Sequence, residues 1–412
     1  MRVAVLARAV FPLHGYGGLE RHVFDLVRAL IERGVDVTLL APPPKDRGMD
    51  AAAVHPKLHA EFIPYRSFPL AGRRGTTVID RSTAYPVWGL RAGGRALELA
   101  RAGRIDIVHG FGASVLGYAR ARRRGDGRAP LVMNPQGLEE FGATDPSRAR
   151  LKRAAYLPLR KAVIACAAAA DAVIATDRSL EPVVLRHLGI PRARMTTIPN
   201  ALDLRTIDAI GDADTQLRLR TQHGLRGGER VLLSVGRLEV SKGFHVLLRA
   251  LAAARDHGGL EGLPWRWIAL GDGPNRAALA SLAAELGLAD RARFLGRVVD
   301  AEMHAWHELS TLFVHPTLYE GSSLVTLEAM AHRRAVVASA AGGIPDKVRP
   351  GENGWLVAPG DPSALAAALS GAVSDPARLT TYGAAGRAIV EREFSWDAAG
   401  DATVALYRRL LG

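Results

Sequence analysis

Short apolar runs alternate with amphipathic stretches along nearly the whole chain. Several of the runs are apolar at every position, which is typical of strands buried on both faces of a parallel sheet. The predicted strands are Val3–Leu6, Val35–Leu40, Ile105–Val108, Leu131–Met133, Ala172–Thr176, Met195–Ile198, Val231–Val235, Trp267–Leu270, Arg293–Leu295, Leu312–Val314, Ala335–Ala338 and Gly354–Val357.

The stretches between these runs have the periodicity of helices. After the first run the apolar residues fall on one helical face, and they are Leu19, Val23, Leu26, Val27, Leu30 and Ile31. Gly34 then ends the helix and a second strand follows, which predicts a βαβ unit. Its repetition predicts an α/β fold with parallel sheets, whose ligands bind at the carboxyl ends of the strands.

A chain of 412 residues is long enough for two such domains. We expect domains at residues 1–205 and 206–392, with a C-terminal helix, 393–412, that packs back on the first domain. The polar stretch Asp208–Gly228 is expected to be a linker with an entry helix. Residues 42–90 show no clear period and are expected to be irregular, and such a segment can cover a substrate site.

The chain has no predicted membrane span. Its N-terminal apolar run is too short for a signal peptide, and the longest run, Ala162–Ala170, is too short to cross a bilayer. We therefore expect a cytoplasmic protein. The single cysteine, Cys166, excludes an internal disulfide and a site built from cysteines.

The net charge of +13 is uneven, because residues 1–205 hold 32 Lys and Arg against 18 Asp and Glu, and the remainder holds 22 against 23. A positive first half attracts nucleic acid, an anionic membrane or an anionic substrate. The alternative is that the chain simply uses arginine as its general surface residue. Nucleic acid is disfavoured, because no recognisable binding module is present and only 6% of residues are aromatic.

A basic helix is predicted at Arg148–Lys161, broken near Pro158. Such a helix can lie on an anionic bilayer, which would place the protein at the inner face of the cell membrane. It can equally be a surface helix with snorkelling arginines.

The most informative stretch follows the strand Leu312–Val314. A loop carries Glu320, and Ser322 and Ser323 offer N-cap oxygens to a helix that carries Glu328. Amides at a helix N-terminus favour an anion, and carboxylates on either side accept hydrogen bonds from hydroxyls. A phosphate between two sugars, as in a nucleotide sugar, fits this arrangement. A glutamate pair alone would more often be two surface residues.

Other strands deliver candidate residues to the same sheet edge. Arg237 and Lys242 follow Val231–Val235 and are a plausible clamp for a diphosphate. In the first half, Gly17 and Gly18 follow the first strand and either let backbone amides approach a ligand or form a tight turn. His109 follows Ile105–Val108 and either serves the reaction centre or packs at the strand end.

These motifs together resemble a known family. With Arg237-x4-Lys242, Gly271–Pro274, Glu320-x7-Glu328 and Gly342-Gly343 in this order, the chain resembles the retaining glycosyltransferases of family 4 over essentially its whole length. The resemblance implies the GT-B fold, two Rossmann-like doubly wound domains facing each other across a cleft. It also implies an acceptor on the first domain, a donor on the second, and catalysis without a bound metal.

The resemblance also implies residue roles. Arg237 and Lys242 would hold the donor diphosphate, and Glu328 the ribose hydroxyls. The catalytic candidates are Glu320, which would contact the donor sugar, and His109. The donor-binding candidates are Gly17, Gly18, Arg237, Lys242, Gly271, Gly296, Arg297, Ser322, Ser323, Leu324 and Glu328.

The chain departs from the family pattern at three places. Phe111 stands where many relatives have a second histidine, so the acid-base residue is unassigned. Asn200 and Asp203 match a signature near the domain junction, but Ala201 replaces its usual glycine. Ser322-Ser323 replaces a common Phe-Gly while leaving the backbone amides in place.

The expected activity is transfer of a hexose from a nucleotide diphosphate sugar, first of all a UDP-sugar, to an acceptor hydroxyl. A glycolipid, lipid-linked or polysaccharide precursor would suit an anionic or membrane acceptor. The alternatives are a small soluble acceptor, or a sugar-nucleotide epimerase or phosphorylase of the same fold. Asp212-Ala-Asp214 resembles a metal-binding motif of another glycosyltransferase class, but a solvated linker is the favoured interpretation.

Overall fold

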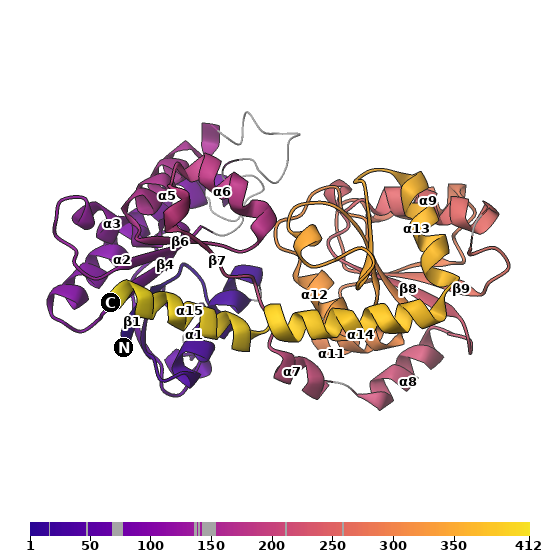
Figure 1. The fold of residues 1–412 in the computed structure, drawn as a ribbon, viewed down its shortest axis with the longest axis horizontal. Helices are drawn as coiled ribbons and strands as arrows, with labels where there is room; N and C mark the ends of the chain where they lie inside the picture. Colours follow the sequence, from indigo (N-terminus) through magenta and orange to yellow (C-terminus); the bar gives the residue numbers. More distant parts are fainter. Residues whose placement is uncertain are drawn as a thin grey trace. The chain divides into compact units, whose positions relative to one another are not determined.

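The computed structural model describes residues 1–15, 17–46, 48–67, 77–135, 138, 141, 154–210, 212–257 and 259–412. The chain forms two compact units (Figure 1). Unit 1 comprises Met1–Asn200 and Trp396–Gly412, and unit 2 comprises Ala201–Ser395. Each contains one parallel sheet with helices packed on both faces, so the predicted pair of doubly wound domains is confirmed.

Unit 1 is built on a seven-stranded sheet in the order β3-β2-β1-β4-β5-β6-β7. The strands are β1 (Arg2–Leu6), β2 (Asp36–Ala41), β3 (His59–Phe62), β4 (Ile107–Phe111), β5 (Leu131–Asn134), β6 (Ala172–Ala175) and β7 (Met195–Thr197). The α-helices described are α1 (Gly18–Glu32), α2 (Thr77–Arg101), α3 (Leu116–Arg122), α5 (Leu157–Ala169), α6 (Glu181–Leu188) and α15 (Trp396–Leu411). Helices α2, α3 and α5 pack together over one face of the sheet, and α1 packs on α15.

Unit 2 has a six-stranded sheet in the order β10-β9-β8-β11-β12-β13. The strands are β8 (Arg230–Val235), β9 (Trp265–Leu270), β10 (Ala292–Gly296), β11 (Leu312–His315), β12 (Val336–Ser339) and β13 (Gly354–Val357). The α-helices are α7 (Leu204–Ile210), α8 (Ala213–Gln222), α9 (Phe244–His257), α10 (Arg276–Glu285), α11 (Asp300–Leu309), α12 (Leu324–Ala331), α13 (Pro362–Val373) and α14 (Pro376–Glu393).

The strands of unit 2 are apolar at consecutive positions because they supply two cores. In β8, Leu232 belongs to the cluster packed with α9 and α13, and Leu233 belongs to the cluster packed with α12 and α14. Val314 and Phe313 divide in the same way in β11. Successive side chains of a strand point to opposite faces, so burial on both faces requires an unbroken apolar run.

The expectation that residues 42–90 are irregular is wrong for two elements. Strand β3 pairs with β2, and α2 begins at Thr77 and continues through Pro86. The glycines of this helix weaken its signal in the sequence, but its packing requires them. A Cβ on Gly89 would lie 2.0 Å from the Ala113 oxygen, and one on Gly93 would lie 2.4 Å from the Tyr118 nitrogen. A helix can carry such residues where its backbone must approach another helix closely.

No helix in the described part of the chain combines the length and apolar character that a membrane crossing requires.

Candidate active site

The centre of the unit 2 sheet places two loops side by side. Strand β8 has β9 on one side and β11 on the other, so the chain changes direction across the sheet between β8 and β11. In open parallel sheets, ligands bind at the carboxyl ends of the strands at such a switch point. The loop after β8 carries Lys242 at the end of a 3₁₀ turn, Val240–Lys242, and the loop after β11 carries Glu320.

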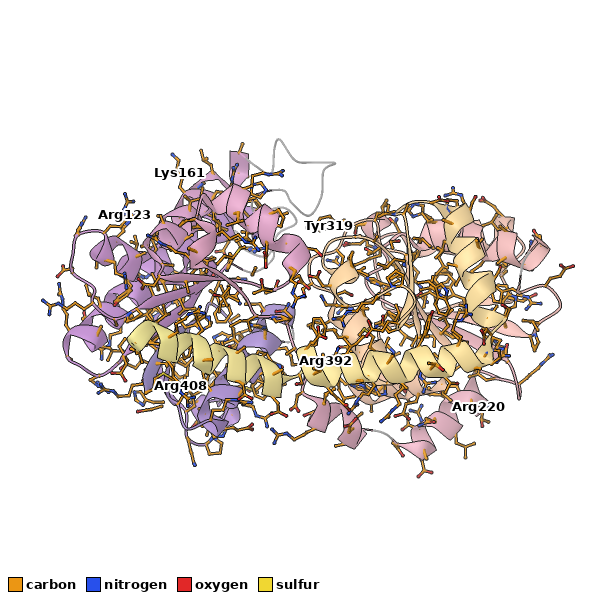
Figure 2. All side chains as sticks on the ribbon, viewed as in Figure 1. Arg123, Lys161, Arg220, Tyr319, Arg392 and Arg408 are labelled. Atoms are coloured by element: carbon orange, nitrogen blue, oxygen red, sulfur yellow. The ribbon has the colours of Figure 1, made fainter. Side chains whose placement is uncertain are left out.

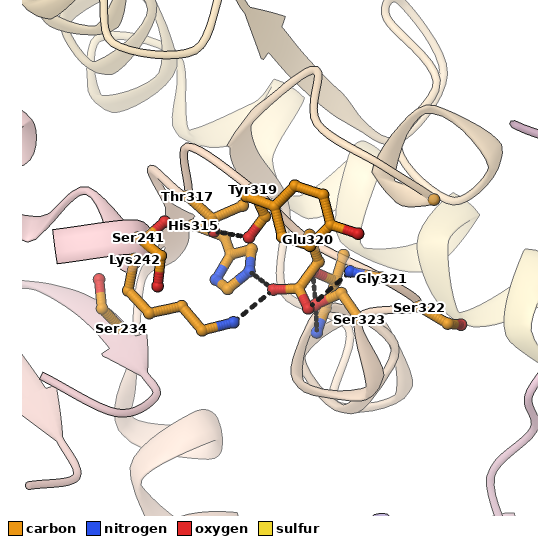
Figure 3. Close-up of polar contacts among 12 residues, drawn as sticks. Ser234, Ser241, Lys242, His315, Thr317, Tyr319, Glu320, Gly321, Ser322 and Ser323 are labelled. Atoms are coloured by element: carbon orange, nitrogen blue, oxygen red, sulfur yellow. Dashed lines mark hydrogen bonds and ion pairs between the residues drawn. The ribbon is translucent and has the colours of Figure 1, made fainter. Parts of the chain in front are cut away.

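Two cationic or polar donors converge on one oxygen of Glu320 (Figure 3). Lys242 Nζ donates to Glu320 Oε2 over 2.7 Å, and His315 Nε2 lies 2.9 Å from the same oxygen. The backbone N–H of Gly321 donates to Oε1 over 3.2 Å. The glutamate side chain is 13% exposed and the histidine side chain 1% exposed, so these contacts lie in a largely dry environment.

These contacts keep Glu320 ionised. Burial by itself raises the pKa of the carboxyl group. The hydrogen bond and charge of His315, with the charge and hydrogen bond of Lys242, act more strongly in the other direction and lower the pKa to about 2. Glu320 is therefore a carboxylate at neutral pH and acts as a hydrogen-bond acceptor only.

Glycines allow the loops to approach this closely. A Cβ on Gly243 would lie 1.9 Å from the Pro316 oxygen, and one on Gly342 would lie 1.7 Å from the Glu320 oxygen. Thr317 Oγ1 donates to the Ser241 oxygen over 3.0 Å, and Gly343 N donates to the Gly321 oxygen over 2.9 Å. Contacts from two other loops therefore hold the segment around Glu320.

The N-terminus of α12 is capped as the sequence predicts. Ser323 is its N-cap and accepts a hydrogen bond from the Thr326 N–H. The neighbouring Ser322 accepts one from Lys347 Nζ over 3.3 Å. Lys347 is fully buried and also donates to the Gly343 oxygen over 3.1 Å. A cation is thus enclosed beside the helix N-terminus, where an anion would also be favoured.

The other donor-binding candidates of unit 2 lie at the same edge of the sheet but have other contacts. Glu328 is half-buried on α12, one turn beyond Leu324. The Arg237 side chain is 70% exposed and pairs with Glu239 over 2.9 Å. Arg297 is exposed directly after β10.

Gly271 and Gly296 have a clear structural role. Their backbones meet in an isolated bridge, with Gly271 N donating to the Gly296 oxygen over 2.7 Å. A Cβ on Gly271 would lie 2.1 Å from the Gly236 oxygen, and both φ angles, 122° and 78°, favour glycine. These two residues therefore bring the ends of β8, β9 and β10 together.

Gly17 and Gly18 follow β1 at the switch point of unit 1, between β1 and β4, whereas His109 lies within β4 and not after it as the sequence had suggested. Gly17 is the N-cap of α1, and Gly18 has open space where a Cβ would lie. His109 is 1% exposed in β4, and its Nδ1 shares a 2.6 Å hydrogen bond with the Tyr407 hydroxyl of α15. Burial, with a smaller effect of His22, lowers the pKa of His109 to about 3, so its imidazole is neutral.

Further sequence candidates have structural contacts or lie outside the described residues. Asp212 caps α8 by accepting from the N–H groups of Asp214 and Thr215, which gives Asp212 a structural role in the entry helix. Asp203 accepts from the N–H groups of Arg205 and Thr206 at the start of α7. In the basic stretch Arg148–Lys161, residues 148–153 lie outside the described part, and α5 begins at Leu157.

Sequence reasoning missed two residues of the unit 2 site, His315 and Lys347. His315 is the last residue of β11, and a polar residue at the carboxyl end of a buried strand is a signal that could have found it. Lys347 follows the Gly342-Gly343 pair by four residues, and no spacing in the sequence indicates that it reaches Ser322.

Comparisons with known proteins match both halves of the chain. The family described as Glycosyltransferase Family 4 matches residues 16–206, and the one described as Glycosyl transferases group 1 matches residues 229–375. A D-inositol 3-phosphate glycosyltransferase of Catenulispora acidiphila is 31% identical over 95% of this chain and 90% of its own. That of Xylanimonas cellulosilytica is 29% identical over 98% and 96%.

Solved structures have the same fold. Sucrose-phosphate synthase from Thermosynechococcus elongatus superposes with a TM-score of 0.74 at 25% identity, over 99% of this chain and 98% of its own. Anabaena HepE in complex with UDP superposes with a TM-score of 0.71 at 20% identity, over 99% and 100%. At that identity the second likeness concerns the fold alone.

Proposed function

The chain belongs to glycosyltransferase family 4, and from that premise we propose that it transfers a hexosyl group from a nucleoside diphosphate sugar to an acceptor hydroxyl with retention at the anomeric carbon. The observation that carries the proposal is the convergence of Lys242 and Glu320 beside the N-terminus of α12, at the switch point of unit 2. This edge offers a cation, the amides of a helix N-terminus and a carboxylate that accepts hydrogen bonds from hydroxyl groups.

Each of these groups has a part in the proposed reaction. The bond between the anomeric carbon and the diphosphate breaks, and its electron pair stays on the diphosphate. The anomeric carbon bonds to the acceptor oxygen as that hydroxyl passes its proton to the departing diphosphate. Lys242 and the α12 amides stabilise the charge that grows on the diphosphate. Glu320 orients the sugar by accepting hydrogen bonds from its hydroxyl groups. No step requires a metal ion, and we propose that none is bound.

We propose UDP as the nucleotide and a phosphorylated polyol as the acceptor. The curated relatives given above are named for D-inositol 3-phosphate, and the Anabaena neighbour was solved with UDP. The excess of positive charge in residues 1–205 favours an anionic acceptor, because a basic surface attracts it from a distance.

An anionic acceptor can also lie in a membrane, and we propose the outer face of α5 as the contact in that case. Leu157 and Ile164 are 47% and 37% exposed, and Lys161 lies between them on the same helical face. Figure 2 shows Lys161 and Arg123 at the edge of unit 1, pointing away from it. Apolar and cationic side chains on one helix face suit an anionic lipid surface.

The deciding experiment is a transfer assay with UDP-, GDP-, ADP- and TDP-glucose against D-inositol 3-phosphate, with uncharged myo-inositol as the matched acceptor. We expect product with UDP-glucose and the phosphorylated acceptor, an α-linkage by NMR, and no loss with EDTA. Release of nucleotide at the same rate without an acceptor, or a β-linked product, contradicts the proposal.

The source of the acceptor is tested separately by sedimentation with vesicles at low and high salt. If the acceptor is a lipid, anionic vesicles bind the parent protein at low salt, and Gln at Arg150, Lys152, Arg153 and Lys161 weakens the binding. Equal sedimentation with neutral and anionic vesicles would contradict a lipid acceptor and favour a soluble one.

A further inference from the structure

We propose that His315 is a positioning residue, whose Nε2–H holds Oε2 of Glu320 and so directs Oε1 to a hydroxyl of the donor sugar. The inference rests on the proposed function for the identity of the ligand. The inference adds separate roles for the two oxygens of the Glu320 carboxylate. It also gives a role to a residue outside the sequence motifs named above.

The histidine ring is buried, and its Nε2 atom contacts Glu320. Its side chain is 1% exposed at the end of β11, and its ring stacks on Phe313 with a centroid distance of 6.0 Å and an interplanar angle of 15°. Nε2 lies 2.9 Å from Glu320 Oε2 (Figure 3). A ring fixed by a strand and by stacking has little freedom, so the hydrogen bond restricts the carboxylate in turn.

The contacts of the ring determine its tautomer. Nε2 faces a carboxylate oxygen and therefore carries a proton. Nδ1 is buried and has no hydrogen-bond partner among the described residues. The Nε2–H group is therefore the donor of this contact.

The two oxygens of Glu320 differ in their remaining capacity. Oε2 accepts from both Lys242 and His315, which occupies the two lone pairs of a carboxylate oxygen. Among the residues that the structure describes, Oε1 accepts only the N–H of Gly321, over 3.2 Å, and one of its lone pairs remains. A sugar hydroxyl therefore binds to Oε1. The groups that act on the charge of Glu320 are His315 from β11 and Lys242 from the loop after β8.

Two substitutions of His315 separate the effect of its hydrogen bond to Glu320 from the effect of its packing on Phe313. His315→Phe keeps an aromatic ring against Phe313 but removes the donor, whereas His315→Gln keeps an N–H donor. The matched control is His307→Phe. His307 is also fully buried beside Phe313, and neither of its ring nitrogens has a hydrogen-bond partner in the described part of the chain. Turnover is measured at pH 7.5 with UDP-glucose and D-inositol 3-phosphate.

We expect kcat of His315→Phe to fall about tenfold to a hundredfold, as for loss of a hydrogen bond to a charged group, with little change in KM for the donor. His315→Gln should recover most of the turnover, and His307→Phe should match the parent. Parental turnover in His315→Phe, or no recovery in His315→Gln, overturns the proposal.

A second readout does not depend on activity. In ¹⁵N-histidine spectra of the parent protein, the resonances lost in His315→Gln should show a ring that carries a proton on Nε2. A ring without a proton on Nε2 overturns the inference even where transfer is observed. If no sugar nucleotide supports transfer, the proposed function fails, and the spectra still decide whether His315 holds Glu320.

Discussion

A Cβ atom on Gly342 would lie 1.7 Å from the carbonyl oxygen of Glu320. Gly342 lies in the loop after β12 and Glu320 in the loop after β11. Their close contact fixes the backbone position from which the Glu320 side chain extends. The glycine pair that marks the family in the sequence is therefore explained by backbone packing in this structure. Gly342 also has a φ of +53°, so two separate constraints exclude a side chain there.

Gly342→Ala should reduce stability and turnover together. The left-handed backbone alone costs about 1–2 kcal/mol for a residue with a Cβ, and the clash adds to it by displacing the Glu320 loop. The matched control is Gly351→Ala, because Gly351 has a φ of +84° but open space around it. Urea unfolding and turnover are compared, and equal losses for the two variants would show that the Glu320 contact is unimportant.

Lys242 and Glu320 should be energetically coupled. Lys242→Met leaves a largely buried carboxylate with one donor fewer, so this single change should destabilise the protein more than the double variant Lys242→Met/Glu320→Gln does. We expect a coupling free energy of about 0.5–3 kcal/mol from urea unfolding of the four proteins at pH 7.5. Additive effects would mean that the 2.7 Å contact contributes nothing in solution.

Arg237→Ala should lower turnover with little effect on stability. The side chain is 70% exposed, and its pair with Glu239 is the kind of surface contact that contributes little to folding. If Arg237 holds the departing diphosphate, kcat falls at saturating donor while the unfolding midpoint stays within error. Glu239→Ala is the control, and parental kcat in Arg237→Ala would remove this residue from the clamp.

Glu328→Gln should weaken binding of the free nucleotide. The loss of a charged acceptor for the ribose hydroxyls corresponds to about 1.5–3 kcal/mol, or roughly tenfold to more than a hundredfold in Kd. Calorimetric titration with UDP measures it, and the exposed Glu285→Gln on α10 serves as the control. Unchanged affinity would contradict the ribose assignment.

Acid should destabilise the protein from about pH 6.5 downward. Burial lowers the pKa of His22 to about 4 and the pKa values of His109 and His332 to about 3. It also lowers the pKa of His307 well below its usual value. In the unfolded chain these rings take up protons below pH 6.5, but the folded protein does not, so stability is complete above that pH and decreases as the pH falls toward 3.

Each such ring contributes up to about 1.4 kcal/mol per pH unit. The variant His307→Phe removes one of them, so its unfolding free energy between pH 6.5 and 5 should have a slope smaller by about one proton. Glu320 loses its stabilising charge only below pH 4.5, and that range is left out of the fit. An unchanged slope would show that His307 titrates normally.

Local patterns predict the strands of this protein well, because burial on both faces leaves a simple apolar run. They fail for α2, where Pro86, Gly89 and Gly93 are turn signals that packing against α3 overrides. At the site, motif spacing indicated Lys242 and Glu320 but not their direct contact. Spacing cannot indicate the hydrogen bond between His109 and Tyr407, since 298 residues separate them and only the return of α15 to unit 1 joins them.

The division of the chain has a consequence for inheritance. Unit 2 occupies one continuous segment within the sequence of unit 1, and its ends adjoin: Leu202 N donates to the Phe394 oxygen over 2.8 Å, and Leu202 bridges Ser395. A segment whose entry and exit are adjacent can be exchanged through two neighbouring junctions. If unit 2 binds the donor and unit 1 the acceptor, as proposed, recombination at these junctions would change the preference for the donor sugar. The preference for the acceptor would be inherited unchanged.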